Sequence, residues 1–324
     1  MPEGYEELRK KYKLHEETES FFQICLESVG WNNPTCDTTV IDSRRIFDEK
    51  TEKFAGDVTF EGTVKEYIVP SAACEGGIPV DVLIPKNCGA RPSILVHFHG
   101  GGYVMGSRMT DSSFCKLLAS EALCVVVNVE YRLAPEHKFP AAVDDARCVL
   151  RWVLMNKPLV GGMNESKVGV CGSSSGGGLA AVVSSEIPGI SYQILINPWL
   201  DITNGQPTCY EFETAPYCCK RSLDWLSEEY IRDPSDKENP RASPLLRKNI
   251  GSQPPTLFLI AELDPLRDQA YEYKKKLKEA GGVAESMLAK GAVHAYMTYP
   301  GHFKELGIRG RDRIMTFIKK RGTV

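Results

Sequence analysis

The chain has 324 residues, 42% of them hydrophobic and 25% charged, with a net charge of −3 at pH 7. This composition suits an α/β protein with one large core, and the weak negative charge argues against a nucleic-acid-binding protein, which would carry a basic surface. Charged residues interleave with apolar ones over the first thirty positions, so we expect no signal peptide, no membrane anchor and a cytoplasmic location.

The cysteines indicate a reducing environment. Eleven are scattered from Cys25 to Cys219 with no C-x-x-C pair, which predicts neither a disulfide framework nor a zinc site. Most are expected to be small buried hydrophobic residues. Cys218 and Cys219 are the exception, because they fall in a segment expected to cover the functional site, and a redox role for them stays open.

In chain order, residues 1–45 have helical patterns with an apolar stripe that includes Phe21 and Phe22. Eight apolar runs then predict strands, and from the third onward most are separated by helical patterns. This alternation is typical of a mostly parallel sheet flanked by helices. The predicted strands are residues 64–70, 78–84, 93–98, 123–129, 167–171, 192–197, 255–261 and 284–289.

Residues 201–252 interrupt this alternation after the sixth strand, with one helical patch and turn-rich flanks. We interpret residues 1–45 and 201–252 as two parts of a helical cap. Residues 46–200 and 253–324 then form the core.

The most informative motif is Gly172-Ser173-Ser174-Ser175-Gly176, which directly follows the fifth predicted strand. G-x-S-x-G is typical of a nucleophile elbow, a tight turn that places a strained serine, here Ser174, at the N-terminus of a helix. Backbone N–H groups there favour developing negative charge. Taken alone, the short pattern leaves open that Ser174 is an ordinary serine in a glycine-rich turn.

Three further motifs follow predicted strands. His99-Gly100-Gly101-Gly102 has consecutive glycines, whose N–H groups can converge on one point as an oxyanion hole requires. Asp264 and His294 come after the seventh and eighth strands, so the order is Ser, Asp, His, as in α/β-hydrolases. Asp268 is an alternative acid, although it lies one helical turn further on. His97 and His99 form an H-x-H pair without an evident third metal ligand.

These motifs, together with the run Tyr131-Arg-Leu-Ala-Pro-Glu-His, resemble the hormone-sensitive-lipase-like family of α/β-hydrolases, which includes arylacetamide deacetylases, bacterial esterases and plant carboxylesterases. The resemblance extends from about Val64 to His294. It implies an α/β-hydrolase fold and a triad of Ser174, His294 and Asp264. The backbone N–H groups of three residues are implied to bind the oxyanion: Gly101, Gly102 and Ser175.

The sequence departs from the family pattern at two motifs. Ser173 and Ser175 flank the elbow serine, where the family usually has Asp and Ala, and Ala295-Tyr296 follows the histidine in place of the usual Gly-Phe. Neither departure removes a reacting group. Both departures are expected to affect the fine adjustment of reactivity at the site and the shape of its pocket.

The function expected is a carboxylesterase acting on small-molecule esters of short to medium chain length, with acetyl amides and carbamoyl esters left open. We expect this reaction to need no metal or organic cofactor. A serine peptidase and a non-catalytic receptor are the alternatives; the related plant gibberellin receptors lack the histidine that His294 supplies. Aromatic residues are expected to shape the pocket, namely Tyr103, Phe212, Tyr217 and Trp225.

Two further expectations concern charge and assembly. Glu211 and Glu213 would favour an alcohol group that carries positive charge, if they face the pocket. The family resemblance also implies that two chains can pair as a homodimer through the sheet edge near residues 284–290.

Overall fold

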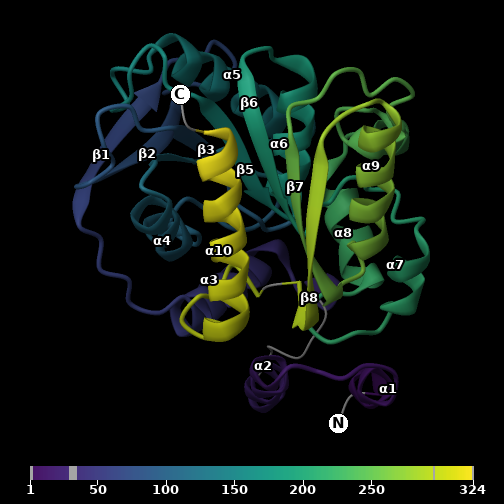
Figure 1. Ribbon diagram of the computed structural model, residues 1–324. Coiled ribbons are helices and arrows are strands. Elements are labelled where there is room, and N and C mark those ends of the chain that lie inside the picture. The colour runs from purple at the N-terminus through teal and green to yellow at the C-terminus, as the bar shows by residue number, and fades with distance from the viewer. Residues whose placement is uncertain (1–2, 29–34, 295, 323–324) are drawn as a thin grey trace.

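The computed structural model describes residues 3–28, 35–294 and 296–322. Within these ranges, eight strands form one sheet in the order β1-β2-β4-β3-β5-β6-β7-β8 (Figure 1). Strand β2 is antiparallel to both neighbours, and all pairs from β4 to β8 are parallel. The strands are β1 (Gly62–Val69), β2 (Ile78–Pro85), β3 (Ile94–Phe98), β4 (Val125–Val129), β5 (Val168–Ser173), β6 (Ile190–Ile196), β7 (Thr256–Leu263) and β8 (Ala284–Val293). The predicted mostly parallel eight-stranded sheet is confirmed.

Helices cover both faces of this sheet because its central strands are apolar on both sides. In β3, Val96 packs into one hydrophobic cluster and Leu95 into the other. Helices α4 (Ser112–Ala122) and α10 (Lys304–Arg321) cover the face turned to the viewer in Figure 1, and their apolar residues belong to the same cluster as Leu95. The apolar residues of α5 (Ala141–Met155), α6 (Ser175–Glu186) and α9 (Arg267–Glu279) join the cluster of Val96.

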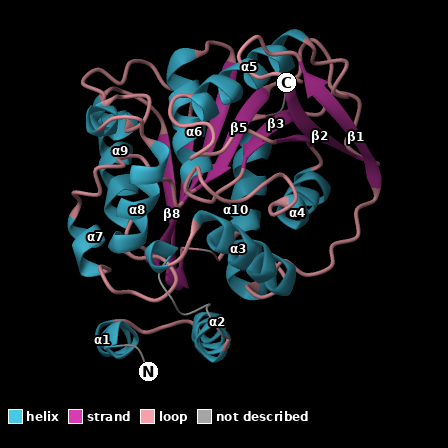
Figure 2. Ribbon diagram, turned by 180° about the vertical axis from the view of Figure 1, so that it is seen from behind, coloured by secondary structure: helices cyan, strands magenta, loops and turns pink. Residues whose placement is uncertain are grey.

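The remaining helices come from the N-terminal segment and from residues 201–252. Helices α1 (Glu3–Lys11) and α2 (Glu16–Glu27) lie beyond the lower end of β8 in both views (Figures 1 and 2). The others are α3 (Val40–Phe54), α7 (Pro207–Glu211) and α8 (Lys220–Tyr230), with short 3₁₀ turns η1 (Thr35–Asp37), η2 (Pro234–Glu238) and η3 (Pro244–Leu246). Among helices in the described ranges, none combines the length and apolarity that crossing a membrane requires.

Helix α3 spans the position at which the N-terminal part of the cap was expected to end. The division at residue 45 falls inside this helix, which begins after Thr39, whose hydroxyl accepts a hydrogen bond from the Asp42 N–H at 3.1 Å. The helix ends just before Gly56, which has a φ of +70° and passes so close to Gly301 that a side chain would collide with it. The N-terminal helical segment therefore continues to Phe54 before the sheet begins.

Candidate active site

The turn between β5 and α6 has the geometry of a nucleophile elbow. Ser174 has φ 55° and ψ −119°, a conformation that a non-glycine residue adopts only when its surroundings impose it. A Cβ on Gly172 would lie 2.1 Å from the carbonyl oxygen of Gly176, and a Cβ on Gly176 would lie 2.0 Å from that of Phe98. Both glycines are therefore required, and the turn presents the Ser174 side chain to a cavity.

Asp264 and His294 meet beyond the ends of β7 and β8. Asp264 is 1% exposed, and its Oδ2 lies 2.8 Å from Nδ1 of His294. Because a carboxylate only accepts, Nδ1 carries the proton. The other carboxylate oxygen of Asp264 accepts from the Leu266 N–H at 2.8 Å, which fixes the acid in place. Asp268 instead lies 3.6 Å from Arg267, so the geometry favours Asp264 over Asp268.

The glycine loop after β3 forms another wall of the site. Gly101 and Gly102 line the cavity together with Ser174 and His294, with φ values of 120° and 66°. A Cβ on Gly101 would lie 2.1 Å from the Met105 carbonyl oxygen, so only glycine fits. Ser175 is fully buried as the first residue of α6, where backbone N–H groups have no partner within the helix.

His99 supports this loop through a hydrogen bond to its backbone. Its Nδ1 donates to the Gly100 carbonyl oxygen at 2.8 Å, and its ring stacks on Tyr131 with a centroid distance of 4.2 Å. Burial lowers the pKa of His99 to about 4, so its ring is neutral. His97 instead pairs with Asp111 at 2.7 Å. The two histidines thus have separate partners, and within the described ranges no three metal-binding side chains come together.

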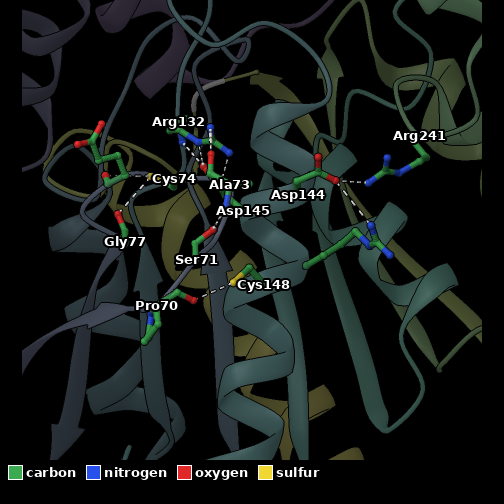
Figure 3. A network of polar contacts seen from close by, with 12 residues as sticks. Pro70, Ser71, Ala73, Cys74, Gly77, Arg132, Asp144, Asp145, Cys148 and Arg241 are labelled. Carbon is green, nitrogen blue, oxygen red and sulfur yellow. Dashed lines mark hydrogen bonds and ion pairs between the residues drawn. The ribbon is translucent and has the colours of Figure 1, made fainter.

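The chain after β4 is fixed by an ion pair between the partly exposed Arg132 and the buried Asp145 (Figure 3). Arg132 binds both carboxylate oxygens of Asp145, at 2.7 and 2.8 Å, and also donates to the Ala73 carbonyl oxygen at 2.7 Å. Nearby, Tyr131 donates its hydroxyl to the His99 carbonyl oxygen at 2.8 Å. The segment that begins with Tyr131 is therefore a scaffold for the glycine loop.

The elbow, the glycine loop and the histidine open onto a cavity of about 100 Å³. Helices α3 and α8 also contribute residues to its wall. Its lining comprises Thr38, Ser43, Ile46, Phe47, Lys50, Gly100, Gly101, Gly102, Met105, Ser173, Ser174, Trp199, Tyr217, Cys218, Ser222, Leu223, Leu226, His294 and Thr298. Most of the wall is apolar, as is typical of pockets for small organic molecules.

Of the four aromatic residues expected in the pocket, the structure places only Tyr217 in its described lining. Tyr103 is 2% exposed and stacks on Tyr230 at 3.9 Å. Phe212 is buried against Tyr12, and Trp225 is half-buried against the core. These three locations correct the expectation: an aromatic residue near the site packs in the core as readily as in a cavity wall. The two cap cysteines also separate, since Cys218 lines the cavity and Cys219 is buried.

The expected acidic cap is also corrected. Glu211 lies outside the described cavity lining and forms ion pairs with Lys11 at 2.5 Å and Arg267 at 3.0 Å. Tyr12 donates a further hydrogen bond to it. Glu213 is exposed and likewise absent from that lining. No Asp or Glu faces the cavity within the described ranges.

The wall formed by α3 was not among the expected parts of the pocket. Ser43, Ile46, Phe47 and Lys50 follow the spacing i, i+3, i+4, i+7 of one helix face. That periodicity is visible in the sequence. It does not tell a face that packs in the core from one that lines a cavity. Of the residues after the histidine, Ala295 lies outside the described ranges, and Tyr296 is fully buried.

A serine elbow, a buried His–Asp pair and a glycine loop at the carboxyl ends of parallel strands define a hydrolase of the α/β type. The family described as alpha/beta hydrolase fold matches residues 95–298, and the chain belongs to this family. The chain is 30% identical over 266 residues to the ethyl acetate hydrolase of Pseudomonas putida, covering 79% of this chain and 82% of that one.

Solved structures agree with this assignment. The hyperthermophilic esterase from the archaeon Pyrobaculum calidifontis aligns with a TM-score of 0.84 at 31% identity, covering 95% of this chain and 98% of that one. A thermostable esterase from Pseudomonas putida ECU1011 aligns with a TM-score of 0.88 at 25% identity, covering 96% and 98%. The resemblance inferred from the sequence motifs is confirmed.

Proposed function

We propose that this protein is a serine carboxylesterase that hydrolyses short- to medium-chain esters of small molecules through an acyl-enzyme on Ser174. The observation that carries the proposal is the cavity shared by Ser174 and His294, with His294 held at 2.8 Å by the buried Asp264. The related ethyl acetate hydrolase and esterases support this class of reaction.

The chemistry follows from the placement of these groups. With Nδ1 bound to Asp264, the Nε2 atom of His294 takes the proton of the Ser174 hydroxyl as its oxygen attacks the ester carbonyl. The C–O bond to the alcohol then breaks, and His294 returns the proton to the leaving oxygen. Water attacks the acyl-enzyme with the same base and releases the acid. Asp264 orients the ring and stabilises its charged form throughout.

The carbonyl oxygen becomes negative in both steps and needs hydrogen-bond donors. The backbone N–H groups of Gly101, Gly102 and Ser175 are assigned this role, and in such sites one donor is worth roughly 10²- to 10³-fold in rate. Gly101 and Gly102 face the cavity, and Ser175 begins the helix that follows the nucleophile. Placing them on rigid elements avoids reorganisation during the reaction.

Location, assembly and domain organisation belong to the same proposal. All eleven cysteines are free, which suits a reducing cytoplasmic compartment. Strand β8 is an edge of the sheet, so two copies can pair there as a homodimer. Residues up to Phe54 and residues 201–252 act as the cap, because both segments contribute to the cavity wall.

The deciding experiment replaces Ser174 by Ala and measures hydrolysis of p-nitrophenyl butyrate and labelling by a fluorophosphonate probe. We expect kcat/KM to fall by about 10⁴-fold or more and labelling to disappear, because direct attack by water replaces the nucleophile. Ser173→Ala is the matched control and should retain labelling. If Ser173 proved essential and Ser174 dispensable, the proposal would be wrong. A protein that neither labels nor hydrolyses any ester would favour the receptor alternative.

A further inference from the structure

One helix face gives the cavity a polar side. Ser43 and Lys50 are seven residues apart on α3, so they lie two turns apart on the same face, with Phe47 between them. The Ser43 hydroxyl also lies 2.5 Å from that of Thr38, which lines the cavity too. The α3 side of the pocket is therefore amphipathic and carries a charge, whereas α8 contributes two leucines and one serine, Leu223, Leu226 and Ser222, and no charged group.

Lys50 is the distinctive member of this face. It is only 7% exposed, and its Nζ lies 5.5 Å from the centre of the Tyr217 ring, on the opposite part of the cap. Burial lowers the pKa of this ammonium group, a sign that it has lost much of its hydration. In the described lining, Lys50 and His294 are the basic side chains, and the Asp264 carboxylate that binds His294 lies outside that lining.

This arrangement discriminates between substrates by charge. A carboxylate that enters a mostly apolar cavity loses its hydration, at a large cost in free energy unless a cation meets it there. A charge-assisted hydrogen bond from a lysine offsets that cost. A cationic substrate finds no compensating acid in the described lining and is repelled by Lys50. The charge preference is the opposite of the one expected from Glu211 and Glu213.

We propose that Lys50 is a specificity-determining residue that selects esters bearing a carboxylate on the part of the substrate that fills this cavity. The substrate class is short half-esters of dicarboxylic acids, or esters of short hydroxy acids. The inference rests on the proposed esterase function and names its substrate class. Lys50 takes no part in the proton transfers and acts through binding alone.

The test compares matched substrates on the wild-type enzyme and on Lys50→Met, which keeps the length of the side chain. For the acyl part, the p-nitrophenyl half-ester of glutaric acid is compared with p-nitrophenyl pentanoate. For the alcohol part, γ-acetoxybutyrate is compared with pentyl acetate. In one of these arms, the ratio of kcat/KM for the acidic to the neutral substrate should fall by about tenfold or more in Lys50→Met, mainly through KM. The arm that responds identifies the part that carries the carboxylate.

Two variants complete the design. Lys50→Arg keeps the charge and should keep most of the preference. Lys53→Met removes an exposed charge from the same helix and should leave both ratios at their wild-type values. Unchanged ratios in Lys50→Met would overturn the proposal. A wild-type enzyme that disfavours both acidic substrates by tenfold or more would overturn it without any variant, even if Lys50→Met fails to fold. Absence of hydrolysis of the neutral esters would instead refute the esterase function itself.

Discussion

His99 shows how one buried residue can support the site while making the free energy of unfolding depend on pH. Its neutral ring donates to Gly100 and stacks on Tyr131, and burial holds its pKa at about 4, below its ordinary value of 6.5. Between these values the unfolded chain binds a proton that the folded protein does not. The free energy of unfolding therefore decreases as the pH falls from 6.5 towards 4, by about 1.4 kcal/mol per pH unit at most.

Replacing His99 by Asn should remove this dependence. The amide can still donate to Gly100, but it does not titrate, so stability should fall less steeply on acidification even if the variant is less stable at neutral pH. Urea unfolding at about pH 7, 6 and 5 measures the slope. The exposed His137, changed to Gln, serves as the control and should keep the wild-type slope. If His99→Asn kept the wild-type slope, the pH dependence of stability would not come from His99.

At the scale of elements, the position of α3 depends on Arg44. This side chain donates to the carbonyl oxygens of Val104 at 2.8 Å and Ala134 at 2.9 Å. It also binds both carboxylate oxygens of Glu136, and this contact lowers the pKa of Glu136 to about 2. Val104 immediately follows the glycine loop and Tyr103. The helix that carries Lys50 is thereby connected to the glycine loop that lies against Ser174.

Arg44→Met should loosen this connection while preserving the aliphatic part of the side chain. We expect a loss of about 1 to 3 kcal/mol in the free energy of unfolding, because buried carbonyl groups lose charged donors. kcat/KM for a butyrate ester should fall by about tenfold. Arg45→Met is the matched control, since Arg45 is 57% exposed and pairs with Asp42 and Glu49 on its own helix. Equal effects of the two changes would argue against the role of Arg44.

At the scale of the whole molecule, an aromatic cluster joins segments that are distant in the sequence. Phe21 of α2 contacts Tyr217 of the insertion, with a centroid distance of 5.1 Å, and Phe54 at the end of α3, at 5.0 Å. It also packs on Tyr299, which follows β8. One aromatic cluster thus joins both segments of the proposed cap to the chain that follows β8. Such a cap favours a small enclosed pocket over a surface that opens onto lipid.

Chain-length preference should reflect this closure. Each added methylene gains about 0.8 kcal/mol, or about fourfold in kcat/KM, only while apolar space remains. We therefore expect kcat/KM of p-nitrophenyl esters to rise from acetyl to a short optimum and then fall before palmitoyl. Tributyrin hydrolysis should show no jump above its solubility limit. Phe21→Ala should shift the optimum to longer chains, and a continuous rise through palmitoyl in the wild type would contradict the closed pocket.

Local patterns in the sequence determined the scaffold. Strand periodicity and the alternation with helices predicted all eight strands. The central strands were the clearest, because a strand buried on both faces must be apolar along its length. The elbow could also be predicted from the sequence, because contacts within the motif and with the adjacent strand require glycine at positions 172 and 176. Asp264 and His294 followed from chain order, because parallel strands bring their carboxyl ends to one edge of the sheet.

Only the tertiary structure decided what surrounds the substrate. Tyr103 and Phe212 pack in the core instead of lining the cavity. Phe47 and Lys50, which lie on α3 beyond the expected boundary at residue 45, are part of the cavity wall. Propensity and periodicity describe neighbours along the chain. Helices α3 and α8 are far apart in the sequence, and both contribute side chains to the wall of the cavity. Which face of a helix meets a cavity is set by long-range packing, and so is the charge that a substrate encounters there.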